Sequence, residues 1–295
     1  MQREPFEIEA DDGERLFAER WRPEGPSRAL VVVSHGWAEH VGRYASLASS
    51  LAEAGFEVLG ADHRGMGRSG GSPGDIEDLR VYVSDLRRVI ACATEAAPGL
   101  PRFVYGHGLG ALIELLRLRE LGGTDPDGHG SVLASPLLSL AMAPPVRDRL
   151  SRGLFRWLAP HAPRAPNFPV AELCRDRQAS DDRVHDARCV LPVTPAWSLA
   201  IRAGMREVRE TVSTIREPSL WLVATGDRFA DHRAALRCFE RLYDPRGDEQ
   251  QVRSFSGAFH ELHQEPPALR SEVFEVVRAW MEGRLGGAES PVLRR

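Results

Sequence analysis

Three stretches of the chain carry residues whose types and spacing fit acid–base chemistry. Asp227 follows an apolar run typical of a buried strand, and His260 lies in the loop after the last predicted strand. A carboxylate that orients an imidazole lets that imidazole act as a general base. The third stretch, residues 106–110, reads Gly-His-Gly-Leu-Gly between a predicted strand and a predicted helix. A nucleophilic serine turn reads Gly-x-Ser-x-Gly at such a junction, so Gly108 stands where the hydroxyl would be.

The order of these residues along the chain strengthens the interpretation. A nucleophile position at Gly108, an acid at Asp227 and a base at His260 follow the chain order of the α/β-hydrolases. The competing interpretation makes Asp227 the cap of the next helix. Asp231 is the better candidate for that cap, which leaves Asp227 available for the site.

A small-residue loop follows another buried strand at residues 34–40, which read Ser-His-Gly-Trp-Ala-Glu-His. Such a turn can aim backbone N–H groups into a cleft and form half of an oxyanion hole. The alternative is an ordinary connection between a strand and a helix. The sequence of this loop alone does not choose between them.

Several short motifs resemble cofactor or metal sites but lack a required feature. Residues 65–70 read Gly-Met-Gly-Arg-Ser-Gly, but another glycine- and proline-containing turn follows instead of a helix, so we predict no dinucleotide site. His260 and His263 are one residue short of the spacing that binds zinc from one helix face. The four cysteines form no CxxC pair. We predict no metal and no cofactor, and we interpret His107 and His263 as structural.

Strand and helix patterns alternate along most of the chain, which predicts a mostly parallel eight-stranded sheet with helices on both faces. The first two strands flank a turn at residues 11–13 and form a hairpin. Strands are expected at 6–10, 15–21, 29–33, 56–61, 102–106, 131–135, 219–225 and 250–255. Helices are expected at 44–54, 78–97, 109–121, 230–243 and 266–284.

The alternation breaks between residues 144 and 216, where the chain has helical patches and prolines but no strand pattern. We predict a core formed by 1–143 and 217–285, a helical cap at 144–216 and a disordered tail at 286–295. Ligands bind at the carboxyl ends of parallel strands, so an insertion rooted there covers the site.

Two apolar stripes in this insertion are expected to line an acyl-sized pocket. One includes Leu150 and Leu154, and the other includes Trp197, Ile201 and Met205. The helix that carries the first stripe also has a row of arginines. The alternative is therefore that it lies on a lipid surface and makes a peripheral membrane contact.

Composition excludes other classes of protein. The net charge is −4 and all 38 cationic side chains are arginine, which gives no basic surface for nucleic acid. No apolar stretch approaches the roughly 20 residues that span a bilayer, and the N-terminus has no signal-peptide pattern. We expect a cytoplasmic protein whose partner is a small molecule; the sequence does not indicate an oligomeric state.

Five motifs together resemble the monoacylglycerol lipase and lysophospholipase branch of the α/β-hydrolase fold. They are HGWAEHVGRY, ADHRGMGRSGG, GHGLG, GDRFAD and GAFHELHQE, and the resemblance covers about residues 5–284. It implies the α/β-hydrolase fold, a single-acyl-chain ester or lipid as substrate, Asp227 as acid and His260 as base. It also implies that Trp37 and Leu109 supply the oxyanion N–H groups. Met66 stands where the family more often has histidine.

Gly108 departs from this pattern, because the family carries the nucleophilic serine there. Glycine tolerates the positive φ of such a turn, so the change removes the chemistry and leaves the turn relaxed. We expect no ester hydrolysis from the chain as it stands. It is either a deliberately inactivated variant, which we favour, or a natural lineage that lost the serine. The alternative functions are a non-catalytic lipid- or small-molecule-binding protein, or a catalyst that uses only the His260 and Asp227 pair as a base.

Overall fold

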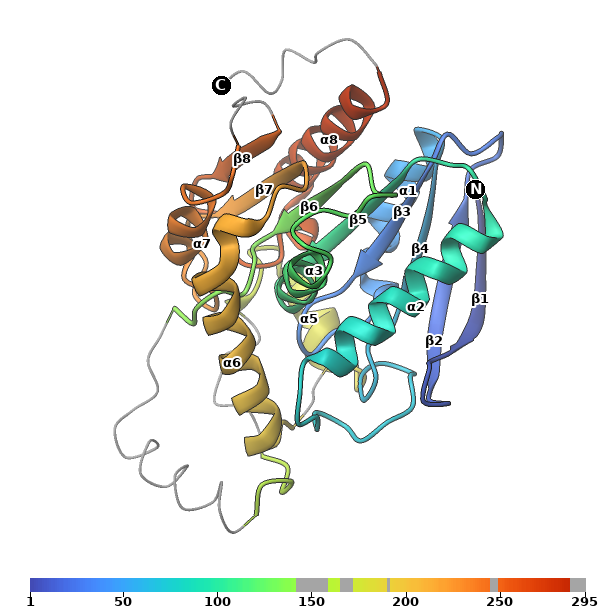
Figure 1. Ribbon diagram of the computed structural model, residues 1–295. Helices are drawn as coiled ribbons and strands as arrows, with labels where there is room; N and C mark the ends of the chain where they lie inside the picture. The colour runs from blue at the N-terminus through green and yellow to red at the C-terminus, as the bar shows by residue number, and fades with distance from the viewer. Residues whose placement is uncertain (142–158, 165–171, 190–191, 245–248, 287–295) are drawn as a thin grey trace.

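The computed structural model describes residues 1–141, 159–164, 172–189, 192–244 and 249–286. Within these ranges the chain forms one eight-stranded sheet with helices on both faces (Figure 1). The strand order is β1-β2-β4-β3-β5-β6-β7-β8, antiparallel at β1–β2 and β2–β4 and parallel elsewhere. The strands are β1 (Gln2–Glu9), β2 (Arg15–Arg22), β3 (Ala29–Ser34), β4 (Phe56–Ala61), β5 (Arg102–His107), β6 (Gly130–Ala134), β7 (Ser219–Ala224) and β8 (Gln250–Phe255). The helices are α1 (Ala45–Glu53), α2 (Arg80–Ala96), α3 (Leu109–Glu120), α5 (Arg177–His185), α6 (Pro195–Thr211), α7 (His232–Phe239) and α8 (Pro267–Arg284).

The central parallel strands are buried on both faces, which explains their continuous apolar sequences. Every residue of β3, β4, β5, β6 and β7 is buried. In β3, Leu30 and Val32 join the apolar cluster that also contains residues of α2 and α3, while Val31 and Val33 join the cluster of α1 and α8. The two layers hold the carboxyl ends of the strands at a common edge.

The N-terminal hairpin and the cap of α7 are confirmed. Glu9 pairs with Arg15 across the turn, and Gly13 has φ +84°, a left-handed conformation that glycine adopts without strain. Asp231 accepts a hydrogen bond from the N–H of Arg233 at 3.0 Å and begins α7. The prediction for α7 was too long, because the helix ends at Phe239 rather than at residue 243.

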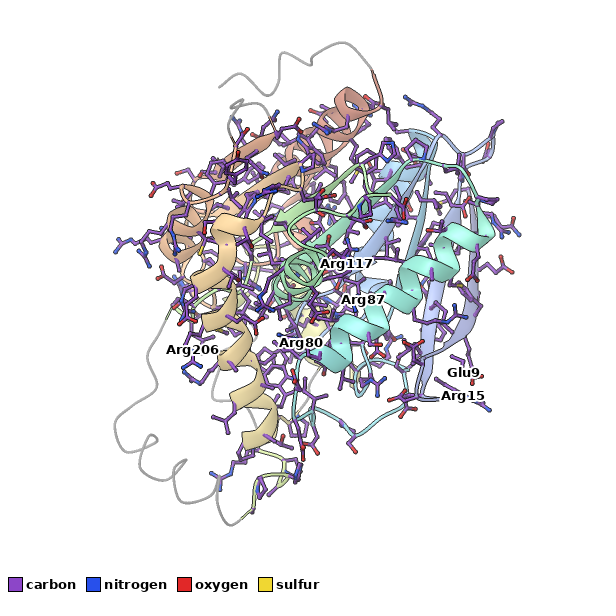
Figure 2. All side chains as sticks on the ribbon, viewed as in Figure 1. Glu9, Arg15, Arg80, Arg87, Arg117 and Arg206 are labelled. Atoms are coloured by element: carbon purple, nitrogen blue, oxygen red, sulfur yellow. The ribbon has the colours of Figure 1, made fainter. Side chains whose placement is uncertain are left out.

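In its described part, the insertion between β6 and β7 contributes α5 and α6. Thr194 caps α6 by accepting the N–H of Trp197 at 3.0 Å. Arg80 of α2 pairs with Glu207 of α6 at 2.7 Å, and Figure 2 shows Arg80 and Arg206 on these two helices. Apolar residues of α6 share one cluster with α2 and α3. The division into core and cap stays a prediction, and residues 142–158 and 287–295 lie outside the described residues.

Candidate active site

The turn between β5 and α3 is formed by a residue in a conformation that disfavours side chains. Gly108 has φ +52° and ψ −108° and directly precedes the first residue of α3. The two other glycines of the motif, Gly106 and Gly110, have no room for a Cβ atom. A Cβ on Gly106 would lie 2.8 Å from the backbone nitrogen of Ala111, and a Cβ on Gly110 would collide with the carbonyl of Ser34. The three glycines therefore allow the strand, the turn and the helix to pack tightly.

Asp227 and His260 meet at the same edge of the sheet, from the loops after β7 and β8. The Nδ1 atom of His260 lies 2.6 Å from Oδ2 of Asp227, and both side chains are almost fully buried. The other carboxylate oxygen accepts the N–H groups of Phe229 and Ala230 at 2.8 and 2.9 Å. Because a carboxylate only accepts hydrogen bonds, the proton of the neutral ring lies on Nδ1, and Nε2 has a free lone pair.

The Nε2 atom of His260 faces residue 108. A Cβ built on Gly108 would lie 2.9 Å from Nε2 and 3.4 Å from Cε1 of the same ring. Outside residues 107–109, the next nearest described atom is the Cα of Gly36 at 3.8 Å. The predicted base, His260, therefore faces the position of the expected hydroxyl, while the predicted acid, Asp227, contacts the other nitrogen of its ring.

Trp37 and Leu109 each directly follow a glycine at this site: Trp37 follows Gly36 in the loop after β3, and Leu109 follows Gly108. The ring of Trp37 stacks on Phe229 with centroids 5.5 Å apart. Leu109 begins α3, so its backbone N–H has no acceptor inside the helix. The loops that carry Gly108, Asp227, His260, Trp37 and Leu109 thus lie at one edge of the sheet. The catalytic roles of these residues stay proposals.

The sequence of residues 25–267 matches the family model described as serine aminopeptidase, S33. The chain belongs to this S33 family. It is 29% identical to human monoglyceride lipase over 292 residues, which cover 95% of this chain and 91% of the human protein. It is 28% identical to the monoacylglycerol lipase of Mycolicibacterium smegmatis over 280 residues, covering 92% of this chain and 95% of that protein.

Solved structures show that this S33 family member has the α/β-hydrolase fold. A soluble variant of Saccharomyces cerevisiae monoglyceride lipase, solved with a substrate analog, superposes with a TM-score of 0.84 at 18% identity, over 96% of this chain and 95% of that one. The monoacylglycerol lipase of Paleococcus ferrophilus gives 0.78 at 24% identity, over 91% and 99%. The predicted family resemblance and fold class are confirmed.

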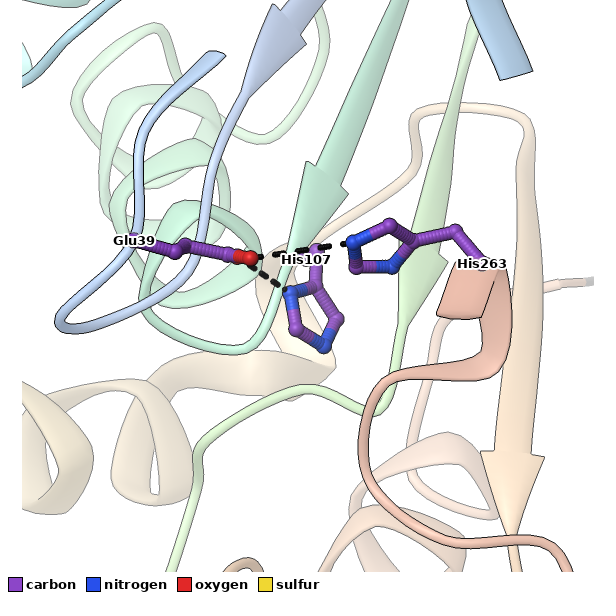
Figure 3. A group of neighbouring side chains, drawn as sticks. All are labelled: Glu39, His107 and His263. Carbon is purple, nitrogen blue, oxygen red and sulfur yellow. Dashed lines mark hydrogen bonds and ion pairs between the residues drawn. The ribbon is translucent and has the colours of Figure 1, made fainter. Parts of the chain in front are cut away.

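A buried polar network lies directly behind His260 in the S33 site. Glu39, His107 and His263 come from three separate segments and converge with their polar ends together (Figure 3). His107 Nδ1 lies 2.9 Å from Oε1 of Glu39, and His263 Nε2 lies 3.6 Å from Oε2. The hydroxyl of Tyr44 donates to Glu39 at 2.5 Å. His107 Nε2 lies 3.2 Å from the backbone oxygen of His260, so the network contacts the predicted base.

The protonation states of this network follow from burial and from the charge of Glu39. Burial disfavours a charged His107, but the Glu39 carboxylate outweighs it and raises the pKa of His107. Burial acts against ionised Glu39 too, yet His107 and then His263 hold the pKa of Glu39 well below its usual value. Burial lowers the pKa of His263. The Glu39 carboxylate thus favours the charged form of His107, whereas burial favours the neutral form of His263.

Metal binding at this and a second cluster does not fit the hydrogen bonding. Two groups of described residues bring three ligand-type atoms within 4.8 Å of one another: Glu39, His107 and His263, and His40, Asp186 and Cys189. Oε1 of Glu39 already accepts from Tyr44 and from the N–H of Gly36, both at 2.5 Å. Asp186 is paired with Arg188 at 2.6 Å. We assign neither group to a metal.

Arg183 and Glu261 support the loops of the site, and sequence analysis did not single them out. Arg183 of α5 donates to the carbonyl oxygens of Ala38 at 2.8 Å and Trp37 at 3.3 Å. It also forms a fully buried ion pair with Glu261, the residue after His260. Ala38 has φ +53°, so the loop at Trp37 is held in an uncommon conformation. No sequence signal could reveal the pair, because its members are 78 positions apart.

The predicted pocket residues are only partly described. The ring of Trp197 lies 5.9 Å from that of Trp37, and its Nε1 donates to the hydroxyl of Tyr82 at 3.3 Å. Ile201 and Met205 are buried in the cluster shared with α2 and α3. Leu150 and Leu154 lie outside the described residues, so an acyl-sized pocket stays a prediction.

Among the described helices, none is long and apolar enough to cross a bilayer.

Proposed function

We propose that this S33 site is that of a serine-type ester hydrolase of the monoacylglycerol lipase and lysophospholipase kind, present here without its nucleophile. The observation that carries the proposal is the direction of His260. Its Nε2 atom points at residue 108, while Asp227 holds its other nitrogen at 2.6 Å. His260 thus faces a residue that has no proton for a base to remove. This arrangement fits a site in which residue 108 carries a hydroxyl group.

In the complete site each residue has a distinct role. A hydroxyl at position 108 would attack the ester carbonyl as Nε2 of His260 removes its proton. Asp227 would stabilise the imidazolium, which then returns the proton to the leaving alcohol. The N–H groups of Trp37 and Leu109 would donate to the oxyanion that forms on the carbonyl oxygen. Gly108 supplies no nucleophile, so we infer that the chain forms no acyl-enzyme.

The proposed substrate is an ester with one acyl chain and a polar head group. Human monoglyceride lipase and the Mycolicibacterium smegmatis monoacylglycerol lipase are relatives over nearly the whole chain. The rings of Trp37, Phe229 and Trp197 form an apolar wall beside His260 that suits an acyl chain. We propose that residues 144–216 cap this wall and carry any peripheral membrane contact.

The test is the gain of esterase activity in Gly108→Ser, measured with a medium-chain monoacylglycerol. We expect kcat to rise by several orders of magnitude above the unchanged chain. Gly108→Ala is the matched control, because it adds the Cβ without the hydroxyl. His260→Ala in the Gly108→Ser background should abolish the gain.

Other outcomes would favour the alternative functions. If Gly108→Ser binds the ester normally but does not hydrolyse it, the catalytic assignment is wrong and a non-catalytic binding protein takes its place. If the unchanged chain turns over ester, and this survives Gly108→Ala but not His260→Ala, the His260 and Asp227 pair works as a base without a nucleophile.

A further inference from the structure

One charged side chain of the insertion between β6 and β7 contacts both loops of the proposed site. Arg183 of α5 is 1% exposed, and its Nη2 atom donates to the carbonyl oxygens of Ala38 at 2.8 Å and Trp37 at 3.3 Å. Its Nη1 atom pairs with the carboxylate of Glu261, the residue after His260. A single planar guanidinium group therefore joins the loop after β3 to the loop after β8.

The two carbonyl groups that Arg183 binds belong to consecutive residues, and this constrains the backbone between them. Successive peptide groups point to opposite sides in an extended strand and to the same side in a helical turn. The two contacts of one nitrogen atom require the second arrangement. Ala38 accordingly has φ +53°, a left-handed conformation that a residue with a Cβ atom rarely adopts. Arg183 therefore stabilises an unfavourable turn directly after Trp37.

The peptide group that carries the N–H of Trp37 is held at its other end by His35. The Nε2 atom of His35 accepts the N–H of His63 at 2.8 Å, and burial keeps the pKa of His35 well below its usual value. The ring is therefore neutral with its proton on Nδ1, which donates to the carbonyl oxygen of Gly36 at 2.8 Å. Since a trans peptide group points its oxygen and its N–H in opposite directions, this bond and the Arg183 contacts together set the direction of the Trp37 N–H.

The loop that carries His260 is bonded to the same insertion. The N–H of Glu261 donates to the carbonyl oxygen of Leu173 at 2.8 Å, and Arg43 contacts the second carboxylate oxygen of Glu261 at 2.7 Å. Burial opposes a charged Glu261, but Arg183 and then Arg43 outweigh it and lower the pKa of Glu261. Glu261 is thus an ionised partner for Arg183, directly beside the proposed base.

Ester hydrolysis at this site requires the two loops to act on one carbonyl group. The proposed base removes a proton from the nucleophile while the proposed oxyanion donor binds the carbonyl oxygen. A misplacement of about 1 Å between such groups lowers the rate about a hundredfold. The distance between the two loops therefore matters for the rate, and Arg183 contacts both of them.

We propose that Arg183 is a positioning residue for the proposed hydrolysis. It holds the turn at Ala38, and through this turn the N–H of Trp37, in place relative to His260. Arg183 acts through the backbone and through Glu261 rather than on the ester itself. The inference rests on the proposed function and adds to it a residue of the insertion that lies outside the five family motifs.

The first test is kinetic and uses Arg183→Lys in the Gly108→Ser background. Lysine keeps a positive charge opposite Glu261, but its single ammonium group does not reproduce the planar fork that reaches the carboxylate and both carbonyl oxygens. We expect kcat for a medium-chain monoacylglycerol to fall about ten- to a hundredfold and KM to change less than about twofold. Arg188→Lys is the matched control, because that arginine of the same insertion pairs with Asp186 and is 37% accessible. It should leave kcat unchanged.

An inhibitor that forms the oxyanion separates positioning from general support of the fold. With octyl trifluoromethyl ketone, the new hydroxyl oxygen bonds to the carbonyl carbon, its proton passes to His260, and the carbonyl oxygen becomes the oxyanion. Arg183→Lys should weaken this inhibition by about the same factor as kcat/KM. Adding Ala38→Gly should restore both about fivefold, since glycine adopts the left-handed turn without strain. A purely structural role of Arg183 would leave the inhibition constant of the folded molecules unchanged.

Amide hydrogen exchange in the unchanged chain gives a second readout, which needs no activity. Arg183→Lys should speed exchange about tenfold in residues 36–41, the loop that contains Ala38. Arg188→Lys should not change exchange there. If Arg183→Lys does not fold, Arg183→Gln combined with Glu261→Gln removes both charges of the pair together and is measured in its place, with the same expected results.

Unchanged kcat in Arg183→Lys, an equal loss in Arg188→Lys, or ketone inhibition that does not follow kcat/KM would overturn the proposal. Its failure is separable from that of the proposed function. Activity of Gly108→Ser that Arg183→Lys leaves intact refutes only the role of Arg183. An inactive Gly108→Ser refutes the hydrolase assignment. Exchange then decides alone: faster exchange in residues 36–41 supports the hold of Arg183 on the loop, and unchanged exchange overturns it.

Discussion

The Nε2 atom of His260 lies 2.9 Å from the point where a side chain on Gly108 would begin. This is closer than a Cβ normally approaches another heavy atom, so the ring occupies part of the room that a side chain would need. The ring is held by Asp227 at 2.6 Å and packs between His107 and Phe229, at centroid distances of 4.7 and 5.0 Å. A residue larger than glycine must displace it.

Gly108→Ser should therefore gain activity and lose stability at the same residue. We expect the free energy of unfolding to fall by about 1–3 kcal/mol, because the new side chain is strained at φ +52° and presses on His260. Urea denaturation measures the change. Gly122→Ser is the matched control: it has φ +82° but nothing within 4 Å of its Cβ, so it reports backbone strain alone. Equal losses in the two variants would show that His260 moves aside without cost.

The unchanged chain should not react with a fluorophosphonate probe. Such probes require an activated hydroxyl, and position 108 has none. Mass spectrometry after tryptic digestion would locate any adduct. Ser135 is the alternative candidate, because it follows β6 with φ +42° and its buried Oγ has no hydrogen-bond partner among the described residues. Stoichiometric labelling of Ser135 would identify a different nucleophile and refute the assignment of Gly108.

Arg183→Met should destabilise the fold strongly. It leaves Glu261 with one cation fewer and removes the donors to the carbonyl oxygens of Trp37 and Ala38. Breaking a fully buried ion pair by removing one partner costs about 3–5 kcal/mol.

The control for this prediction is Arg188→Met, whose ion pair with Asp186 is more exposed, with side chains 37% and 20% accessible. That change should cost at most about 1 kcal/mol. Urea midpoints of the two variants give the comparison. The interpretation of Arg183 as a support of the site is refuted if both variants are equally stable.

Glu217 should make stability depend on pH. Burial, with smaller contributions from the charges of Glu114 and Asp125, raises the pKa of Glu217 from 4.5 to about 7. Its carboxyl group accepts from Thr124 and from the N–H of Asp125, which only partly offset the burial. Because the folded-state pKa is raised, the stabilisation is fully present below pH 4.5 and is lost as pH rises to about 7.

The corresponding measurement compares the unchanged chain with Glu217→Gln across that interval. The stability of the unchanged chain relative to the variant should decline by about 3 kcal/mol as the pH rises. Glu210→Gln removes an exposed carboxylate on α6 and should leave the profile parallel to that of the unchanged chain. Parallel profiles for Glu217→Gln as well would mean that Glu217 does not ionise within this interval.

The order of strands and helices could be predicted from the sequence because it depends on local periodicity. The apolar runs at 29–33 and 56–61 have no polar alternation, which marks strands covered on both faces. Asp227 and His260 could be proposed because polar residues in the loops after parallel strands gather at one edge of the sheet. Gly108 could be proposed because it and the two glycines that flank it, Gly106 and Gly110, fit a turn that few other residues allow.

The sequence by itself thus determined the fold class, and it predicts the acid, the base and the position of the absent nucleophile. Only the tertiary structure decided how closely His260 approaches Gly108, and that Arg183 and Glu261 form a buried pair beside them. It also decided that the Glu39 carboxylate lies beside His107 and raises the pKa of that histidine. In each of these contacts, residues far apart in the sequence lie within a few ångströms of one another. Periodicity specifies which face of an element is buried, but only the packing of all the elements determines which polar atoms meet there.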